Sequence, residues 1–127
     1  MAIAIDRIDH IVLTVFDIDR TIDFYSRVLG MEPDTFGEGR RALRFGVQKL
    51  NLHRVGAEIE PHARRPTPGS ADLCFVVDGL DGVLDELREL GIPIEAGPVD
   101  RTGALGAIRS VYFRDPDANL VEVAEYR

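Results

Sequence analysis

The chain is poor in cysteine and tryptophan and has no long apolar run. It contains one cysteine, Cys74, and no tryptophan in 127 residues. A single cysteine excludes an internal disulfide framework and any zinc site built from several cysteines. No apolar run approaches the roughly 20 residues that span a bilayer, and Met1 to Arg7 has neither the basic start nor the apolar stretch of a signal peptide. We therefore expect a cytoplasmic protein.

Basic residues are also in the minority. Lys and Arg number 15 against 22 Asp and Glu, which gives a formal net charge of −7. This charge repels phosphate backbones and anionic lipid headgroups at long range, so we expect neither nucleic acid nor a membrane surface as a partner. With 45% hydrophobic and 29% charged residues, the composition is that of an ordinary globular chain. The length fits a single domain over residues 1–127.

Two stretches of the chain repeat the same order of predicted elements. The first module, about residues 5–56, opens with a β-branched strand over Ile8 to Val15. An amphipathic helix follows, and alternating apolar residues up to Val55 then predict an antiparallel meander. The apolar positions of the helix are Ile18, Ile22, Tyr25 and Leu29, with Asp17 or Asp19 as a cap and Gly30 at its end.

A proline-rich linker, about residues 57–70, precedes the second module, about residues 71–127. There the pattern restarts, with His10 matched by Asp72 and Gly30 by Gly91. The expected elements are a strand over Ala71 to Asp78, a helix from Leu80 to Leu90, and strands over Ile108 to Phe113 and Leu120 to Ala124. The order βαβββ occurs twice. We expect an α+β fold of two modules related by a pseudo-twofold, with mixed sheets curving around a cleft.

Strand periodicity puts several polar side chains on the sheet faces opposite the helices, because successive side chains of a strand point to opposite faces. These residues are His10, Asn51, His53, Asp72 and Glu122. A polar group on a largely buried face costs several kcal/mol unless it has partners, and a divalent metal ion is one such partner. Alternatives remain: Asp72 and Glu122 could form hydrogen bonds or salt bridges with Arg44 or Arg109, and Asn51 could be a satisfied amide.

The chain resembles the vicinal oxygen chelate superfamily in three segments, which are Asp9–Val15, Thr21–Met31 and Phe113–Val123. That superfamily includes glyoxalase I, fosfomycin-resistance enzymes, extradiol dioxygenases and bleomycin-resistance proteins. The resemblance implies a glyoxalase-like fold and covers nearly the whole chain.

The resemblance also implies a set of site residues. Metal-dependent members take ligands from positions that here hold His10, Asn51, Asp72 and Glu122. An imidazole at His10 and carboxylates at Asp72 and Glu122 would suit Mn²⁺, Fe²⁺, Zn²⁺ or Ni²⁺. Glyoxalase-type sites would have a carboxylate in place of Asn51, and most catalytic members have His or Gln in place of Asp72.

Other polar residues would then contact the substrate. His53 would be a fourth ligand or a general base. Tyr112 occupies a position where fosfomycin-resistance-like members direct a tyrosine toward substrate oxygens, although it could equally be a packed strand aromatic. Arg40, Arg41 and Arg44 would meet an anionic substrate or form a solvated edge. We expect Cys74 to be an inert small hydrophobe.

Three functions fit these expectations. The first is a metal-dependent enzyme, of lyase, isomerase, transferase or dioxygenase type, that chelates two oxygens of a small substrate. The second is a metal-free protein that sequesters a small molecule, similar to bleomycin-resistance proteins, in which the acidic charge would suit a cationic guest. The third is a scaffold domain, which leaves the polar face unexplained. In each case we expect a homodimer.

Overall fold

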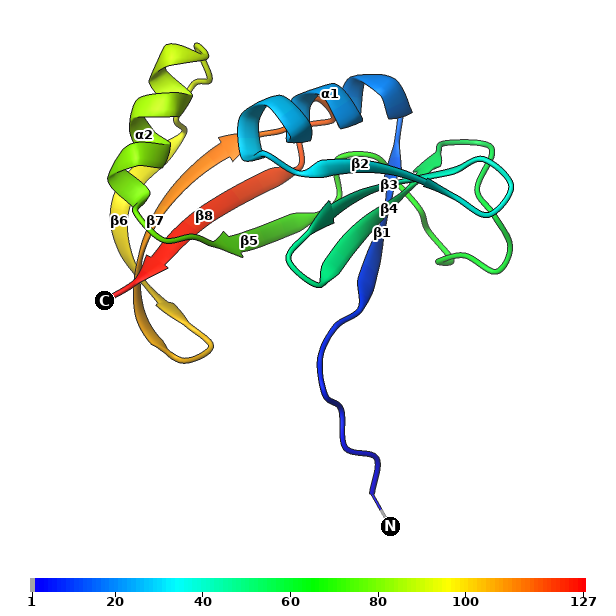
Figure 1. Cartoon of the computed structure of the whole chain (residues 1–127), viewed down its shortest axis with the longest axis horizontal. Helices are drawn as coiled ribbons and strands as arrows, with labels where there is room; N and C mark the ends of the chain where they lie inside the picture. The colour runs from blue at the N-terminus through cyan, green and yellow to red at the C-terminus, as the bar shows by residue number, and fades with distance from the viewer. Residues whose placement is uncertain (1) are drawn as a thin grey trace. The chain divides into compact units, whose positions relative to one another are not determined.

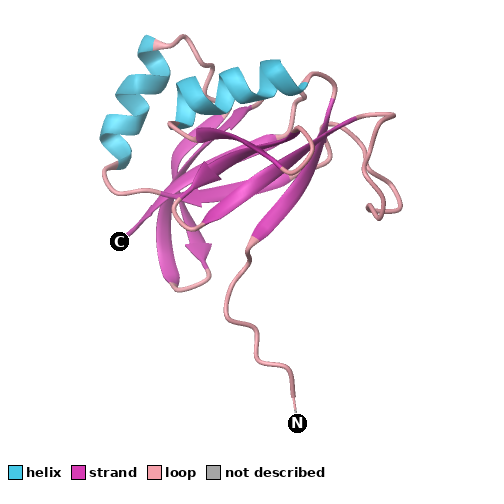
Figure 2. Cartoon of the chain, turned by 45° about the vertical axis from the view of Figure 1, so that its right-hand side comes forward, coloured by secondary structure: helices cyan, strands magenta, loops and turns pink. Residues whose placement is uncertain are grey.

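The computed structural model describes residues 2–127, which form two compact units. Unit 1 runs to Thr67 and unit 2 from Pro68 to Arg127. In the described residues each unit contains one four-stranded mixed sheet and one helix (Figures 1 and 2). The order βαβββ, found twice, confirms the predicted α+β fold. Within the described part of the chain, no helix has the length and apolar character needed to cross a membrane.

Unit 1 is built on a sheet with the strand order β1-β4-β3-β2. Its elements are β1 (His10–Val15), α1 (Ile18–Leu29), β2 (Glu32–Phe36), β3 (Arg40–Phe45) and β4 (Gln48–Arg54). β1 is parallel to β4, whereas β3 is antiparallel to both of its neighbours. α1 packs on one face of this sheet, against β2, β3 and β4 (Figure 2).

Both ends of α1 form as the sequence predicts. The Asp17 carboxylate accepts a hydrogen bond from the backbone N–H of Arg20 at 3.1 Å, which satisfies one of the unpaired donors at a helix start. Gly30 ends the helix with φ 67°, a conformation that costs glycine little, and its N–H donates to the carbonyl of Ser26. The helix buries Ile22 and Tyr25.

The two faces of the unit 1 sheet differ in chemistry. Leu13, Leu50 and Leu52 are buried on the face toward α1. Alternation puts His10, Asn51 and His53 on the opposite face, which we call the polar face of unit 1.

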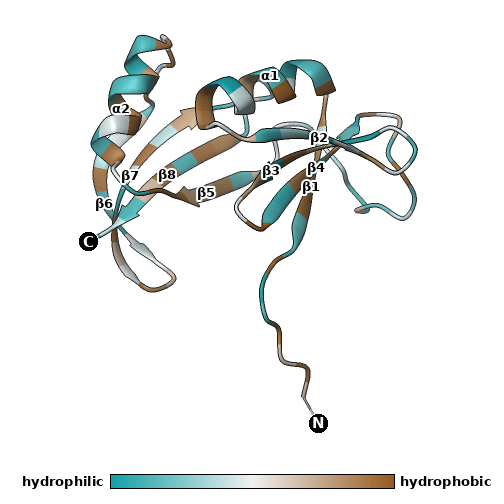
Figure 3. Cartoon of the chain, viewed as in Figure 1, coloured by the Kyte–Doolittle hydropathy of each residue, from teal (hydrophilic) through white to brown (hydrophobic). Residues whose placement is uncertain are grey.

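Unit 2 repeats this plan with the strand order β5-β8-β7-β6. Its elements are β5 (Asp72–Val76), α2 (Leu80–Glu89), β6 (Ala96–Gly103), β7 (Gly106–Arg114) and β8 (Leu120–Tyr126). Apolar residues alternate along β7 and β8 and form a stripe on α2 (Figure 3). Val121 and Val123 are fully buried, and Asp72, Cys74 and Glu122 lie on the other face, the polar face of unit 2.

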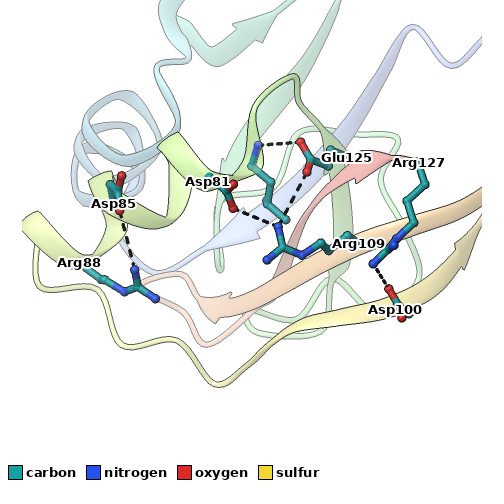
Figure 4. A network of polar contacts seen from close by, with 8 residues as sticks. Asp81, Asp85, Arg88, Asp100, Arg109, Glu125 and Arg127 are labelled. Carbon is teal, nitrogen blue, oxygen red and sulfur yellow. Dashed lines mark hydrogen bonds and ion pairs between the residues drawn. The ribbon is translucent and has the colours of Figure 1, made fainter.

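The start of α2 has no side-chain cap from its own N-cap residue, Gly79. Instead the Leu80 N–H donates to the carboxylate of Glu125 on β8 at 2.9 Å (Figure 4). Arg109 on β7 then connects this carboxylate, at 3.9 Å, with Asp81 in the first helical turn, at 3.0 Å. The acidic groups suit the positive end of the helix dipole, so this network attaches α2 to the sheet.

The predicted turn between β7 and β8 is a closed hydrogen-bonded structure. The buried Asp115 carboxylate accepts from the N–H groups of Asp117 and Asn119 at 2.9 and 3.0 Å, and from the Asn119 amide at 2.8 Å. The Asn119 side chain in turn accepts from the N–H of Ala71 at 2.9 Å. These residues hold the ends of β5 and β8 together.

Candidate functional site

Glu122 lies at the centre of the polar face of unit 2. It stands opposite Cys74 on β5 and Tyr112 on β7, and it is half-buried. Its Oε2 accepts a hydrogen bond from Ser110 Oγ at 2.6 Å. This bond fixes one carboxylate oxygen in a sheet of well-ordered strands, which is how proteins commonly orient a ligand or catalytic acid.

The alternative of a hydrogen bond holds for Glu122, whose partner is Ser110, whereas neither predicted arginine pairs with Asp72 or Glu122. The Arg44 guanidinium forms an ion pair with Asp34 at 3.2 Å, and Arg109 is engaged at the start of α2. Asp72 is exposed at the first position of β5. Asp72 and Glu122 are therefore on one sheet face without either predicted arginine.

Tyr112 belongs to the same face as Glu122. Its hydroxyl accepts a hydrogen bond from Arg101 Nε on β6 at 3.1 Å, and the Arg101 guanidinium lies 5.5 Å from the ring centroid. Burial raises the pKa of Tyr112 above its usual value, and the negative charge of Glu122 acts in the same direction. The phenol is therefore protonated at neutral pH and can donate a hydrogen bond.

Cys74 was predicted to be an inert small hydrophobe, and its raised pKa agrees with the inertness. The residue is exposed and faces Glu122 across the two strands. Desolvation of the thiol, followed by the charge of Glu122, raises the pKa of Cys74 to about 11. Because the thiolate is the nucleophilic form, the thiol is a poor nucleophile at neutral pH.

His10 begins β1 with its imidazole exposed. Its Nδ1 lies 2.8 Å from Oδ1 of Asp9. A carboxylate accepts hydrogen bonds, so Nδ1 carries the hydrogen and the Nε2 lone pair is left for another partner. The bond to His10 is also the main reason that the pKa of Asp9 is lowered.

Asn51 and His53 are buried in β4, with 4% and 5% of their surface exposed. Among the described residues, the Asn51 Oδ1 atom and both ring nitrogens of His53 have no hydrogen-bond partner. Burial lowers the pKa of His53, and the positive charge of Arg40 lowers it further. His53 is therefore a neutral imidazole at neutral pH.

The strand register separates the two histidines. His10 is paired with Lys49, whereas His53 is paired with Thr14, four positions further along β1. Four residues of strand span about 13 Å. Because metal–nitrogen bonds are only about 2 Å long, His10 and His53 of one unit do not reach the same ion. This separation argues against His53 as the fourth ligand.

The candidate ligands are divided between the units, with His10 in unit 1 and Asp72 and Glu122 in unit 2. Within residues 2–127, the structure gathers no group of three or more His, Cys, Asp or Glu side chains that could hold a metal ion.

The sequence analysis missed two residues of the polar face of unit 2, Ser110 and Arg101. Ser110 could have been found from the spacing, because it lies two residues before Tyr112 on the same strand and so on the same face. Arg101 carried no such signal, since its contact with Tyr112 depends on how β6 pairs with β7.

Comparisons with known proteins agree with the fold. A family model described as the glyoxalase/bleomycin resistance protein/dioxygenase superfamily matches residues 7–123. The virulence protein STM3117 of Salmonella typhimurium is 57% identical over 123 residues, which are 96% of this chain and 85% of that protein. Its crystal structure has a TM-score of 0.97 at 56% identity and covers 98% of this chain, and this chain covers all of it.

Two further relatives carry names from the same superfamily. The glyoxalase domain-containing protein RDO1 of Mycosarcoma maydis is 52% identical over 126 residues, 98% of this chain and 71% of that protein. The lactoylglutathione lyase of Pseudomonas aeruginosa is 30% identical over 148 aligned positions, 92% of this chain and 81% of that protein. The chain therefore belongs to the glyoxalase/bleomycin resistance protein/dioxygenase superfamily.

Proposed function

We propose that the protein is a divalent-metal-dependent enzyme that acts on a small oxygenated substrate, with His10, Asp72 and Glu122 as the metal ligands. The observation that carries this proposal is the His10–Asp9 pair. A carboxylate bound to one ring nitrogen orients the imidazole, leaves Nε2 free and is a common arrangement around metal-bound histidines.

The donor set fits such an ion. His10 offers a nitrogen, Asp72 an exposed carboxylate, and Glu122 a carboxylate with one oxygen oriented by Ser110. Mixed nitrogen and oxygen donors suit Mn²⁺, Fe²⁺, Ni²⁺ and Zn²⁺. When bound, an ion of this kind supplies electrostatic stabilisation to negative charge on substrate oxygens.

The chain's own polar residues provide the remaining chemistry. The protonated Tyr112 hydroxyl, held by Arg101, donates a hydrogen bond to a substrate oxygen. His53 is neutral at neutral pH and so can accept a proton as a general base. The lactoylglutathione lyase among the relatives supports an enzymatic role of this general type.

Metal titration tests the proposal. On protein stripped with chelator, calorimetry with Mn²⁺, Fe²⁺, Ni²⁺ and Zn²⁺ should show binding of at least one ion, weakened at least about tenfold in His10→Ala and in Glu122→Ala. Glu86→Ala, which removes an exposed carboxylate of α2, is the matched control and should bind as the unmodified protein does. Affinity should fall as the solution is acidified, because metal ions bind the deprotonated forms of imidazole and carboxylate ligands.

The alternative is metal-free binding of a small molecule. Asn51 favours it, because this amide stands where glyoxalase-type metal sites would have a carboxylate. Its buried Oδ1 lacks a hydrogen-bond partner among the described residues. Binding no tighter than millimolar for all four ions, and unchanged in Glu122→Ala, would favour this alternative.

A further inference from the structure

The polar face of unit 1 carries two cations on one aromatic ring. The Lys49 ammonium lies 3.5 Å from the centroid of the Phe36 ring, and the Arg40 guanidinium carbon lies 4.9 Å from it. Both distances are within the range of favourable cation–π contacts. We call these three residues the basic cluster.

The basic cluster connects the two ends of the polar face. Lys49 is paired with His10 at one end of the face. At the other end Arg41 is paired with Leu52, which places the preceding residue, Arg40, beside His53. Since Lys49 and Arg40 meet at the same ring, their side chains bridge the distance that separates His10 from His53.

In the described part of the chain the cations of the basic cluster belong to no ion pair, although the Lys49 charge helps to lower the pKa of Asp9. Within residues 2–127, neither Arg40 nor Lys49 forms an ion pair with a carboxylate, whereas Arg44 on the same face is paired with Asp34 at 3.2 Å. The Asp9 carboxylate is bonded to His10.

The charge of Glu58 raises the pKa of His53, and the Glu58 carboxylate accepts a hydrogen bond from the Gly56 N–H at 2.6 Å. His62 acts on His53 in the opposite sense. The charges around His53 therefore leave Arg40 as an unpaired cation beside a neutral imidazole.

Beside the cluster lie buried polar atoms without partners. The His53 ring nitrogens and Asn51 Oδ1 are on the same sheet face as Arg40 and Lys49. A buried polar atom without a hydrogen bond costs about 1–3 kcal/mol, so such atoms in native proteins require an explanation. A bound ligand with its own donor and acceptor atoms supplies one.

We propose that the basic cluster, with His53 and Asn51 beside it, binds a carboxylate group, and hence that the substrate is an organic carboxylic acid in its anionic form. This inference deepens the proposed function, and it rests on that function where it calls the bound acid a substrate. Arg40 supplies the planar donors that match a carboxylate, Lys49 supplies a second positive charge, and the His53 ring supplies a neutral hydrogen-bonding group.

The net charge of −7 does not oppose this assignment. Exposed charges further away than a Debye length, about 8 Å at physiological ionic strength, are largely screened. The local pair of cations therefore decides which ligand the face prefers. The cationic guest expected from the overall charge is not favoured here.

Calorimetric titration of metal-free protein with acetate, succinate and glutarate tests the proposal. At least one of them should bind, and its Kd should rise at least about tenfold in Arg40→Gln and, separately, in Lys49→Gln. Arg54→Gln is the matched control, because it removes the same charge from the next position of β4 after His53, on the opposite face of the sheet. Its Kd should stay within about twofold of the unmodified protein.

Four results would overturn the proposal. The first is absence of binding for all three acids at millimolar concentration, and the second is a rise in Kd in Arg54→Gln as large as in Arg40→Gln. The third is an affinity for the neutral diamide succinamide equal to that for succinate. The fourth is tighter binding of inorganic phosphate than of the acids, with the same dependence on Arg40. Repeating the titration in the presence of the tightest-binding metal ion separates the two proposals. Carboxylate binding without metal binding contradicts only the metal-dependent function, and metal binding without carboxylate binding contradicts only this inference.

Discussion

At the scale of single residues, the buried imidazole of His53 couples folding to pH. Burial lowers its pKa in the folded chain below the ordinary value of 6.5. Between that lowered value and 6.5 the unfolded chain binds the proton and the folded chain does not. Stability is therefore complete above about pH 6.5 and falls as the pH drops toward the folded-state pKa.

We expect His53→Gln to reduce this pH dependence. Urea denaturation midpoints at about pH 8 and about pH 5 should differ less in the variant than in the unmodified protein. His62→Gln is the control of opposite sign, because the Ala63 carbonyl bonded to His62 raises its pKa and protonation there favours the folded chain. An unchanged difference between the two pH values in His53→Gln would show that the folded chain accepts a proton at His53 without penalty.

The sequence predicts which residues lie on the polar faces of the two sheets. It does not predict which side chains these residues contact. Alternation along the strands identified His53 and Glu122 as members of the polar faces, since a period of two is a local property. The bond from Ser110 to Glu122 and the meeting of Lys49 with Phe36 depend on strand register and on side-chain reach. Neither can be calculated from the spacing of residues in one strand.

At the scale of elements, the contact between helix and sheet supports each unit. Leu13 on β1 is 4% exposed and Leu87 on α2 is fully buried. We expect Leu13→Ala and Leu87→Ala each to lower the free energy of unfolding by about 2–5 kcal/mol, because truncation leaves a cavity as well as losing buried apolar surface. Chemical denaturation measures the loss. Val47→Ala, at a residue that is 75% exposed, should change the midpoint little.

The helices could be predicted more exactly than the strand β6. α1 has an apolar stripe, a capping aspartate and a terminal glycine, three local signals that agree. β6 contains Gly97 and Pro98 and is largely exposed, so it lacks the alternation that marks a strand. Gly97 has φ 105°, and a Cβ there would lie 2.4 Å from the Ser110 carbonyl oxygen. The pairing with β7 therefore requires glycine, a residue that strand propensity disfavours.

At the scale of the whole molecule, the internal repeat predicted that both halves have the same topology. The structure bears this out, because β1-β4-β3-β2 and β5-β8-β7-β6 are the same order of strands. Which carboxylate meets which histidine does not follow from the repeat. The repeat predicts the order of strands in each unit, whereas the side-chain contacts depend on residues that the two units do not share.

We expect the protein to assemble as a homodimer. β1 is an edge strand, and an edge strand offers unpaired backbone groups to another chain. Around it Ile8 and Val12 are 59% and 42% exposed, which is apolar surface that association would bury. Light scattering at micromolar concentration should therefore give a mass near twice the 14.1 kDa of the chain.

Val12→Lys should shift this mass toward that of a single chain, because a charged residue on an edge strand opposes pairing and burial. Val47→Lys introduces the same charge at another exposed apolar residue, in the turn between β3 and β4, and should leave the mass unchanged. A mass near 14.1 kDa for the unmodified protein would contradict the prediction.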